Sequence, residues 1–214
     1  MTIHTLAGFH HRFEPGADSA APPLLLLHGT GGDENDLIGL GRALSPGSAL
    51  LSPRGPVLES GMPRFFRRLA EGVFDEADVR RRAGDLAAFV AQARAEYGLA
   101  APVAVGFSNG ANIAAATLLL HPETLAGAVL LRAMVPLSER PSVVLGGRPV
   151  LLLSGALDPI VPTDNAARLA DDLQAAGAEV THTVQPAGHN LSQADLAAAA
   201  DWLSRRFAQG ATLA

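Results

Sequence analysis

The stretch that decides the fold is Val103-Ala-Val-Gly106-Phe-Ser108-Asn-Gly110-Ala-Asn-Ile113, where a short apolar run meets a Gly-x-Ser-x-Gly pentapeptide and then a helix-like sequence. Glycine on both sides of Ser108 permits a sharp turn that larger side chains would crowd. The pattern therefore predicts a buried strand, a strained turn that presents the serine hydroxyl, and a helix. In a simpler interpretation, the pentapeptide is only a turn in which Ser108 or Asn109 caps the helix.

Working outward, apolar runs of strand length alternate with longer segments of helical period. Strands are expected at residues 24–27, 49–51, 103–107, 127–131, 150–153 and 179–184. Helices are expected at residues 34–44, 76–97, 109–121, 164–176 and 192–208. This alternation predicts an α/β fold with a mostly parallel sheet and helices on both faces. The 214 residues contain no evident linker or repeat, so we expect one domain over residues 1–214.

Two segments do not fit this alternation of strands and helices. Residues 5–13, followed by turn-forming residues 14–18, predict an antiparallel edge strand. Residues 52–74, here called the 52–74 segment, contain too many Pro and Gly residues for a regular element and are too aromatic and basic for a plain loop. Loops of this length in compact domains tend to be functional, so a role at the site is expected.

Composition excludes several classes of function. Sixteen basic and twenty-one acidic residues give a net charge of −5 with dispersed acids, so we expect no nucleic-acid and no membrane partner. Cysteine is absent, which excludes disulfides, thiolate metal sites and cysteine nucleophiles. Every basic residue is arginine, which excludes a Walker lysine, a Schiff base and a Ser-Lys dyad. Without a signal-peptide core or a membrane-length apolar run, we expect a soluble, cytoplasmic protein.

Three residues suited to nucleophilic catalysis, Ser108, Asp158 and His189, each come shortly after an expected strand. Taken singly, Asp158 before a proline is typical of a turn, and a loop histidine is typical of a solvated surface. The carboxyl ends of parallel strands share one edge of a sheet, so the three side chains are expected to meet. Their roles would be nucleophile, orienting carboxylate and general base, in an order that differs from trypsin-like and subtilisin-like proteases.

Donors for a developing oxyanion are expected from the glycine-rich loop His28-Gly-Thr30-Gly-Gly32, which follows the first buried strand. The backbone N–H of Thr30, together with that of Asn109, would form the oxyanion hole. A phosphate cradle is the rival interpretation, but the acidic residues 33–36 and the lack of lysine disfavour it. Asp33 is expected instead to cap the next helix. No convergent ligand set is visible, so we expect no metal.

These blocks, with Asp158-Pro-Ile-Val-Pro162 and Gly188-His189, resemble the phospholipase/carboxylesterase family of α/β-hydrolases, especially its bacterial branch of small esterases. The likeness runs from about residue 22 to 207 and implies an α/β-hydrolase fold, the triad and oxyanion hole named above, and no cofactor. It also implies action on carboxylic esters, sometimes thioesters or lysophospholipids, and the capacity to form a homodimer. Members that act on lipidated proteins usually carry Gln and then Gly-Gly beside the nucleophile, whereas this chain has Asn109-Gly-Ala, so that activity is not expected.

We therefore expect a serine carboxylesterase that hydrolyses small soluble esters through an acyl-enzyme on Ser108. The alternatives are a thioesterase or lysophospholipase with the same triad, and a scaffold that binds a small molecule without catalysis. Only residues 132–149 separate two expected strands, so no cap domain is expected and the 52–74 segment is the only sizeable cover.

The 52–74 segment contains the residues expected to contact substrate. Arg64 is predicted to recognise a polar or anionic acyl substituent, because its fork geometry suits a carboxylate, and Phe65 to wall the pocket. In the alternative interpretation, Phe65 and Phe66 anchor the loop in the core and the arginines are solvated. Arg132 ends an apolar strand near the expected site, and nothing in the sequence explains a charge there.

Overall fold

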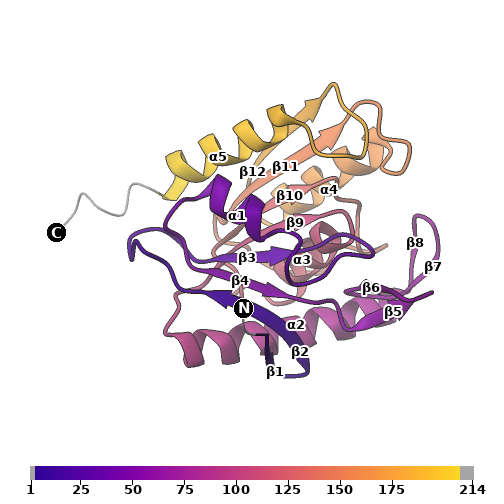
Figure 1. Cartoon of the computed structure of the whole chain (residues 1–214). Helices are drawn as coiled ribbons and strands as arrows, with labels where there is room; N and C mark the ends of the chain where they lie inside the picture. The colour runs from indigo at the N-terminus through magenta and orange to yellow at the C-terminus, as the bar shows by residue number, and fades with distance from the viewer. Residues whose placement is uncertain (1–2, 208–214) are drawn as a thin grey trace.

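The computed structural model describes residues 3–207 and is built around an eight-stranded sheet (Figure 1). The strands lie in the order β1-β2-β4-β3-β9-β10-β11-β12. β1 and β2 pair antiparallel, as do β2 and β4, and the other neighbours pair parallel, which confirms the mostly parallel sheet. The bounds are β1 (His4–Leu6), β2 (Phe9–Glu14), β3 (Leu24–Leu27), β4 (Leu50–Pro53), β9 (Val103–Phe107), β10 (Gly127–Leu131), β11 (Pro149–Gly155) and β12 (Glu179–Gln185).

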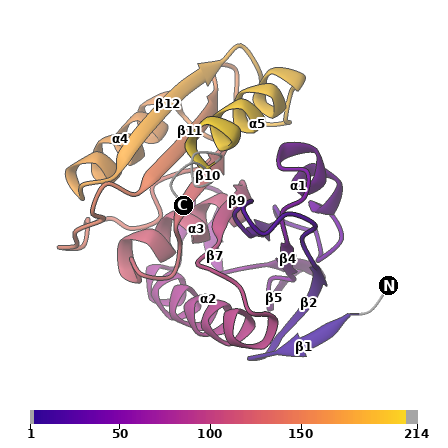
Figure 2. The same cartoon turned by 90° about the vertical axis from the view of Figure 1, so that its left-hand side faces the viewer.

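Helices cover both faces of this sheet, as Figure 2 shows from the side. One face packs against α2 (Glu76–Tyr97), α3 (Asn109–Leu120) and α4 (Thr163–Ala175), and the other against α1 (Ile38–Leu44) and α5 (Gln193–Phe207). The central strands are apolar along their whole length because both of their faces are buried. Residues 1–2 and 208–214 of the expected domain, including the last residue of the expected helix 192–208, lie outside the described residues.

The start of α1 differs from the expectation. The helix begins at Ile38 rather than at residue 34, and its N-cap is Leu37. Asp33 does not cap it: its carboxylate accepts the N–H of Asn35 at 2.8 Å and so stabilises a turn. Glu34 is fully buried in an ion pair with Arg54, 2.5 Å between Nε and Oε2. In this acidic stretch, Asp33 thus stabilises a turn, and the buried carboxylate of Glu34 pairs with the partly exposed Arg54.

Two segments that lacked a clear pattern in the sequence contain short hairpins. The expected edge strand at residues 5–13 is the hairpin β1–β2, which turns at Ala7-Gly8. The 52–74 segment, expected to hold no regular element, contains β5 (Val57–Glu59) with β6 (Met62–Arg64), and β7 (Arg68–Ala70) with β8 (Val73–Phe74). Both residues of the Ser60-Gly61 turn have positive φ, 50° and 81°, as tight two-residue hairpins require.

The connection from β10 to β11, residues 132–148, contains no helix or strand, and no cap domain is inserted there. Within residues 3–207, no helix is both long enough and apolar enough to span a lipid bilayer. The cover over the carboxyl ends of the strands comes instead from the β5–β8 hairpins, which project at the right of Figure 1.

Candidate active site

Ser108 occupies a strained turn between β9 and α3. Its φ is 52° and its ψ −113°, a conformation that costs a non-glycine residue about 1–3 kcal/mol. The turn is held because the Ser108 N–H donates to the carbonyl of Leu131 at 2.8 Å. A Cβ on Gly110 would lie 2.0 Å from the carbonyl oxygen of Leu27, and one on Gly106 would lie 2.6 Å from that of Gly110. Both glycines are therefore required for the backbone to pass.

The hydroxyl of Ser108 is the first member of a hydrogen-bonded chain. Its Oγ lies 3.0 Å from Nε2 of His189, and Nδ1 of His189 lies 2.9 Å from Oδ2 of Asp158. Ser108 makes no side-chain cap bond to α3, so the capping interpretation does not describe this hydroxyl. The three side chains come from the ends of β9, β11 and β12, as the shared edge of a parallel sheet dictates.

The side chain of Asp158 is fully buried, and both of its carboxylate oxygens have hydrogen-bond partners. Its second oxygen, Oδ1, accepts the N–H groups of Ile160 at 2.8 Å and of Val161 at 3.0 Å. Because Oδ2 faces Nδ1 of His189, the proton of the neutral imidazole is placed on Nδ1, and Nε2 is left to accept from Ser108. This arrangement points the acceptor nitrogen of the imidazole at the Ser108 hydroxyl.

The oxyanion-hole candidates lie at the two loops on either side of Ser108. Thr30 and Asn109 both line the cavity that contains the serine. In the described chain, the backbone N–H groups of these two residues make no hydrogen bond to a loop, turn or side-chain acceptor. Both donors are therefore available to a substrate oxygen.

His28 braces the loop that contains Thr30. Its Nδ1 lies 2.6 Å from the carbonyl of Gly29, and its Nε2 accepts the N–H of Gly55 at 2.9 Å. Burial lowers the pKa of His28 against the opposing effects of the Gly29 carbonyl and nearby acids. The neutral ring thus ties the loop after β3 to the start of the 52–74 segment.

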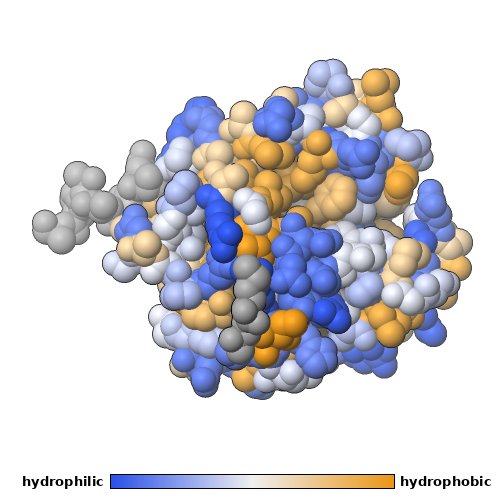
Figure 3. Space-filling model, in the orientation of Figure 1, coloured by the Kyte–Doolittle hydropathy of each residue, from blue (hydrophilic) through white to orange (hydrophobic). Residues whose placement is uncertain are grey.

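A cavity of about 240 Å³ opens beside Ser108 and His189. Ligand pockets usually measure about 300–1,000 Å³, so this one suits a small molecule. Its other walls are both apolar and polar: Thr30, Arg64, Arg68, Glu71, Gly72, Phe74, Phe107, Asn109, Asn112, Arg132, Met134, Ile160 and Val161. Outside the cavity, Leu58 and Met62 are exposed on the β5–β6 hairpin, where the surface intermixes apolar and polar residues (Figure 3).

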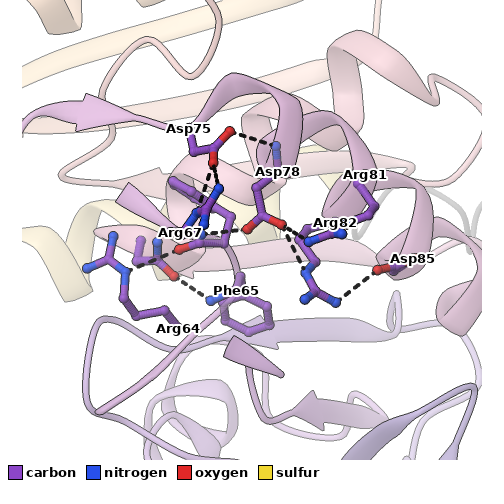
Figure 4. Close-up of polar contacts among 10 residues, drawn as sticks. Arg64, Phe65, Arg67, Asp75, Asp78, Arg81, Arg82 and Asp85 are labelled. Carbon is purple, nitrogen blue, oxygen red and sulfur yellow. Dashed lines mark hydrogen bonds and ion pairs between the residues drawn. The ribbon is translucent and has the colours of Figure 1, made fainter. Parts of the chain in front are cut away.

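One ion pair and one backbone hydrogen bond join the 52–74 segment to the start of α2 (Figure 4). The backbone N–H of Arg67 donates to Oδ2 of Asp78 at 2.7 Å, and its guanidinium pairs with Asp75, the N-cap of α2. Asp78 is itself paired with Arg81 and Arg82. The backbone at Arg67 is therefore held against the first turn of α2, whose own arginines pair with the same carboxylate.

The structure separates the two substrate-binding predictions in this segment. Phe65 is 1% exposed, packs against His28 with ring centroids 4.8 Å apart, and is not among the cavity residues. The expectation that Phe65 walls the pocket is wrong, because its ring is needed in the core; Phe74 and Phe107 supply aromatic walls instead. Arg64 does line the cavity, and it is neither solvated nor free.

Arg64 is 3% exposed, with one Nη1 bond to the hydroxyl of Thr30 at 2.6 Å and one Nε bond to the carbonyl of Phe66 at 3.2 Å. Glu59 lies 3.2 Å from its Nε. Burial lowers the pKa of Arg64, which the Glu59 carboxylate opposes, and a guanidinium stays protonated in proteins. The side chain thus places a fixed positive charge in the cavity wall.

Several cavity residues were missed by the sequence analysis. Asn112 lies one helical turn after Ser108 and so shares its face of α3, a spacing that could have identified it. Its Oδ1 accepts the N–H of Met134 at 2.8 Å. Ile160 and Val161 follow Asp158 closely, whereas the position of Phe74 depends on the fold of the hairpins. Among residues 3–207, no group of three or more His, Asp or Glu side chains is placed to hold a metal ion.

Known hydrolases resemble this chain in both sequence and fold. The family model described as Phospholipase/Carboxylesterase matches residues 10–206. The putative hydrolase MhqD of Bacillus subtilis (strain 168) is 42% identical over 194 residues, which cover 90% of this chain and 96% of MhqD. The Bacillus cereus carboxylesterase structure has a TM-score of 0.90 at 43% identity, covering 92% of this chain and 94% of that one. The structure of YahD with malic acid has a TM-score of 0.87 at 29% identity, covering 92% and 98%. The chain belongs to the phospholipase/carboxylesterase family of α/β-hydrolases.

Proposed function

We propose that the protein is a serine carboxylesterase that hydrolyses small soluble carboxylic esters through an acyl-enzyme on Ser108. The observation that supports this most directly is the unbroken chain of hydrogen bonds from Ser108 Oγ through His189 to the buried Asp158. A serine hydroxyl is a weak nucleophile until a neighbouring base takes its proton, and the base needs a carboxylate to hold its tautomer.

Acylation begins when Nε2 of His189 takes the proton of Ser108 Oγ as that oxygen attacks the ester carbonyl carbon. The carbonyl oxygen becomes an oxyanion, which accepts the N–H groups of Thr30 and Asn109. When the tetrahedral intermediate collapses, the bond to the alcohol oxygen breaks and His189 gives its proton to that leaving group. Asp158 stabilises the imidazolium that exists between these two transfers.

Deacylation repeats the same transfers with water in place of the alcohol. His189 takes a proton from water as the water oxygen attacks the acyl carbon; when the intermediate collapses, the bond from Ser108 Oγ to the acyl carbon breaks and His189 returns the proton to Oγ. The carboxylic acid then leaves. Both half-reactions depend on the same base, so a displacement of His189 slows both of them.

The preference for small esters rests on the cavity and on its cover. A space of about 240 Å³ has no room for a long acyl chain, and no cap extends its walls. Phe74 packs with Met134 and Val161 in a small apolar cluster beside the connection after β10. This cluster forms part of a short acyl wall between the β7–β8 hairpin and the loop after Asp158.

Arg64 supports a preference among small esters. Its guanidinium lines the same cavity as Ser108 and has donors beyond those used by Thr30 and Phe66. A carboxylate or other polar acceptor on the acyl group would accept hydrogen bonds from these remaining donors. The similar structure of YahD is one with malic acid, a small dicarboxylic acid, which agrees with this assignment.

Reaction with an active-site phosphonate tests the proposal, with the intact protein measured by mass spectrometry. We expect one adduct per chain on Ser108 in the wild type and none in Ser108→Ala, together with hydrolysis of short esters. Lack of adduct and of turnover would support a non-catalytic binding scaffold instead. Faster turnover of matched thioesters or lysophospholipids than of short esters would replace the substrate class while keeping the nucleophile.

A further inference from the structure

Arg132 is a fully buried cation at the point where β10 ends. Its φ is 58°, a left-handed conformation, and its N–H donates to the carbonyl of Leu153 at 2.9 Å. The residue before it, Leu131, accepts the N–H of Ser108 at 2.8 Å. The strained turn of the candidate nucleophile and the backbone of Arg132 are therefore joined through a single peptide unit.

The guanidinium of Arg132 contacts the loop on both sides of His189. Its Nε donates to the carbonyl of Gly188 at 2.8 Å, and its Nη2 donates to the carbonyl of Asn190 at 3.2 Å. These are the residues immediately before and after the histidine. A planar group that bonds both neighbours limits the translation and the rotation of the backbone between them.

Asp195 fixes the guanidinium in turn. Its two oxygens accept from Nη1 at 2.9 Å and from Nη2 at 2.7 Å, and both side chains are fully buried. The backbone N–H and the hydroxyl of Ser192 also donate to Asp195, at 2.8 and 2.7 Å. Burial alone would raise the pKa of Asp195, but the bonds from Arg132 and Ser192 outweigh it and the pKa lies below its ordinary value.

We propose that Arg132, held by Asp195, is a positioning residue that sets the place of the His189 imidazole relative to Ser108 through the carbonyls of Gly188 and Asn190. The catalytic consequence rests on the proposed function, whereas the geometric consequence does not. A buried ion pair is weak evidence for stability, because well-packed apolar residues often do as well in its place. Apolar residues, however, would leave the two loop carbonyls without donors and His189 without a brace.

The decisive variant is Arg132→Met/Asp195→Asn, which removes both charges together so that no ion is left buried alone. The amide oxygen introduced by Asp195→Asn can still accept from Ser192, so the start of α5 keeps its cap. We expect kcat on a short ester to fall about 100-fold with KM within threefold, since a displacement of about 1 Å in a catalytic group has this effect. Asp195→Asn alone leaves Arg132 buried without its counter-ion, so its kcat is expected to lie between those of the wild type and the double variant.

Arg148→Met is the matched control. Arg148 also donates to backbone carbonyls, those of Leu125 at 3.0 Å and Leu145 at 2.9 Å, but it lies at the opposite end of the sheet. Its kcat should stay within twofold of wild type. All rates are divided by the concentration of Ser108 that a phosphonate labels at completion, so partial unfolding does not count as slow catalysis. A folded double variant with kcat within threefold of wild type overturns the proposal.

If the double variant does not fold, Arg132→Lys decides the question. An ammonium keeps the charge opposite Asp195 but cannot bond both carbonyls and both carboxylate oxygens at once. A fall in kcat of fivefold or more at wild-type melting temperature supports positioning, and an unchanged kcat excludes it.

A measurement without substrate separates this proposal from the proposed function. In the ¹H spectrum of protein with ¹⁵N-labelled histidine, the Nδ1 proton of His189 that bonds Asp158 is assigned by its loss in His189→Ala. We expect this resonance to weaken or shift in the double variant and to remain in Arg148→Met, whether or not the protein turns over esters. An unchanged resonance in the double variant contradicts the positioning role.

Discussion

The two sides of the cavity are built in different ways. Ser108, Asp158 and His189 each follow a strand of the central sheet, where ladder hydrogen bonds fix the register of β9, β10, β11 and β12. The opposite side is the 52–74 segment, which consists of two short hairpins held by one ion pair to the N-cap of α2 and by the buried ring of Phe65. In the proposed reaction, the sheet places the reacting atoms and the segment contacts the rest of the substrate. This division predicts that rate and selectivity respond to different substitutions.

The largest effect is expected on the sheet side. Ser108→Ala and His189→Ala should each lower kcat by about 10⁴- to 10⁶-fold, because the members of such a chain act as a unit. Asp158→Asn should cost less than Ser108→Ala. Thermal melting should show that each variant remains folded. Ester hydrolysis by Ser108→Ala within tenfold of wild type would show that the chain of hydrogen bonds is not the catalytic apparatus.

On the segment side, the largest effect is expected on stability. Phe65→Ala should lower the free energy of unfolding by about 3–5 kcal/mol, because it removes a buried ring that packs on His28. Leu58→Ala is the control from the same segment; Leu58 is 71% exposed, so its loss should stay within about 0.5 kcal/mol. Urea unfolding measures both. A loss of less than about 1 kcal/mol in Phe65→Ala would mean that the segment is not anchored through this ring.

Selectivity should change most at Arg64. A hydrogen bond to a charged group contributes about 1.5–3 kcal/mol, so Arg64→Ala should lose about 10- to 100-fold in kcat/KM on an ester whose acyl group bears a carboxylate. The loss on a neutral ester of similar size should be much smaller. Arg67→Ala, from the same segment but outside the cavity, should leave the ratio of the two substrates unchanged.

Equal losses on both esters in Arg64→Ala would point to a different role, since Arg64 also bonds the hydroxyl of Thr30 beside the proposed oxyanion hole. Thr30→Val tests this directly, because it removes that hydroxyl and keeps the backbone N–H. If Thr30→Val reproduces the loss of Arg64→Ala on the neutral ester, Arg64 supports the loop rather than the substrate.

His28 joins the two sides and should make stability depend on pH. Its folded pKa is lowered, so below the unfolded value of about 6.5 the unfolded chain binds a proton that the folded chain does not. The contribution of His28 to the free energy of unfolding is therefore fully present above about pH 6.5, and it is lost as the pH falls below this value. At about pH 5.5 the loss cannot exceed about 1.4 kcal/mol, the equivalent of one pH unit.

Urea unfolding at pH 7.5 and 5.5 measures this loss. His28→Gln cannot titrate, so it should lose less stability than the wild type over this interval. His11 and His182, whose pKa values burial also lowers, remain in both proteins and cancel in the comparison. The same loss in both proteins would mean that His28 does not contribute to the pH dependence.

The smallest effect is expected from acyl length. Each buried methylene would contribute about 0.8 kcal/mol, or about fourfold in kcat/KM, if the wall of the cavity continued along the chain. A space of about 240 Å³ bounded by Phe74 and Met134 ends early, so kcat/KM should level off or fall after a few carbons. A steady rise through long-chain esters, or activation by micelles, would favour the lysophospholipase alternative.

Much of the sheet side could be predicted from the sequence, because local pattern and tertiary position agree there. The expected bounds of β3, β9, β10 and α2 match the structure, since continuous apolar runs and a long helical period leave little choice of register. The strand ends then place Ser108 and His189 at one edge by topology alone.

The segment side could not be predicted in the same way. Its hairpins depend on tight turns such as Ser60-Gly61 and on the hydrogen bond from the Arg67 N–H to Asp78 of α2. Neither feature produces a periodic pattern of apolar residues. An aromatic residue at position 65 suits both the core and a pocket wall, so the sequence does not distinguish these two places for Phe65. Only the packing of the folded chain shows that its ring lies against His28 rather than facing the substrate. The proposed role of Arg132 depends on Asp195, which is distant in the sequence. The sequence around the arginine therefore did not indicate that role.

The two hairpins of the 52–74 segment affect how the protein can evolve. Their turns, at Ser60-Gly61 and at Gly72, contribute no member of the chain from Ser108 to Asp158. Gly72 lines the cavity whereas Ser60 and Gly61 do not, so insertions or substitutions at the Gly72 turn are expected to change the cavity wall and to leave Ser108, Asp158 and His189 in place. Under the proposed function, changes confined to this one turn offer a route to a new range of substrates that leaves the residues of the hydrogen-bonded chain unchanged.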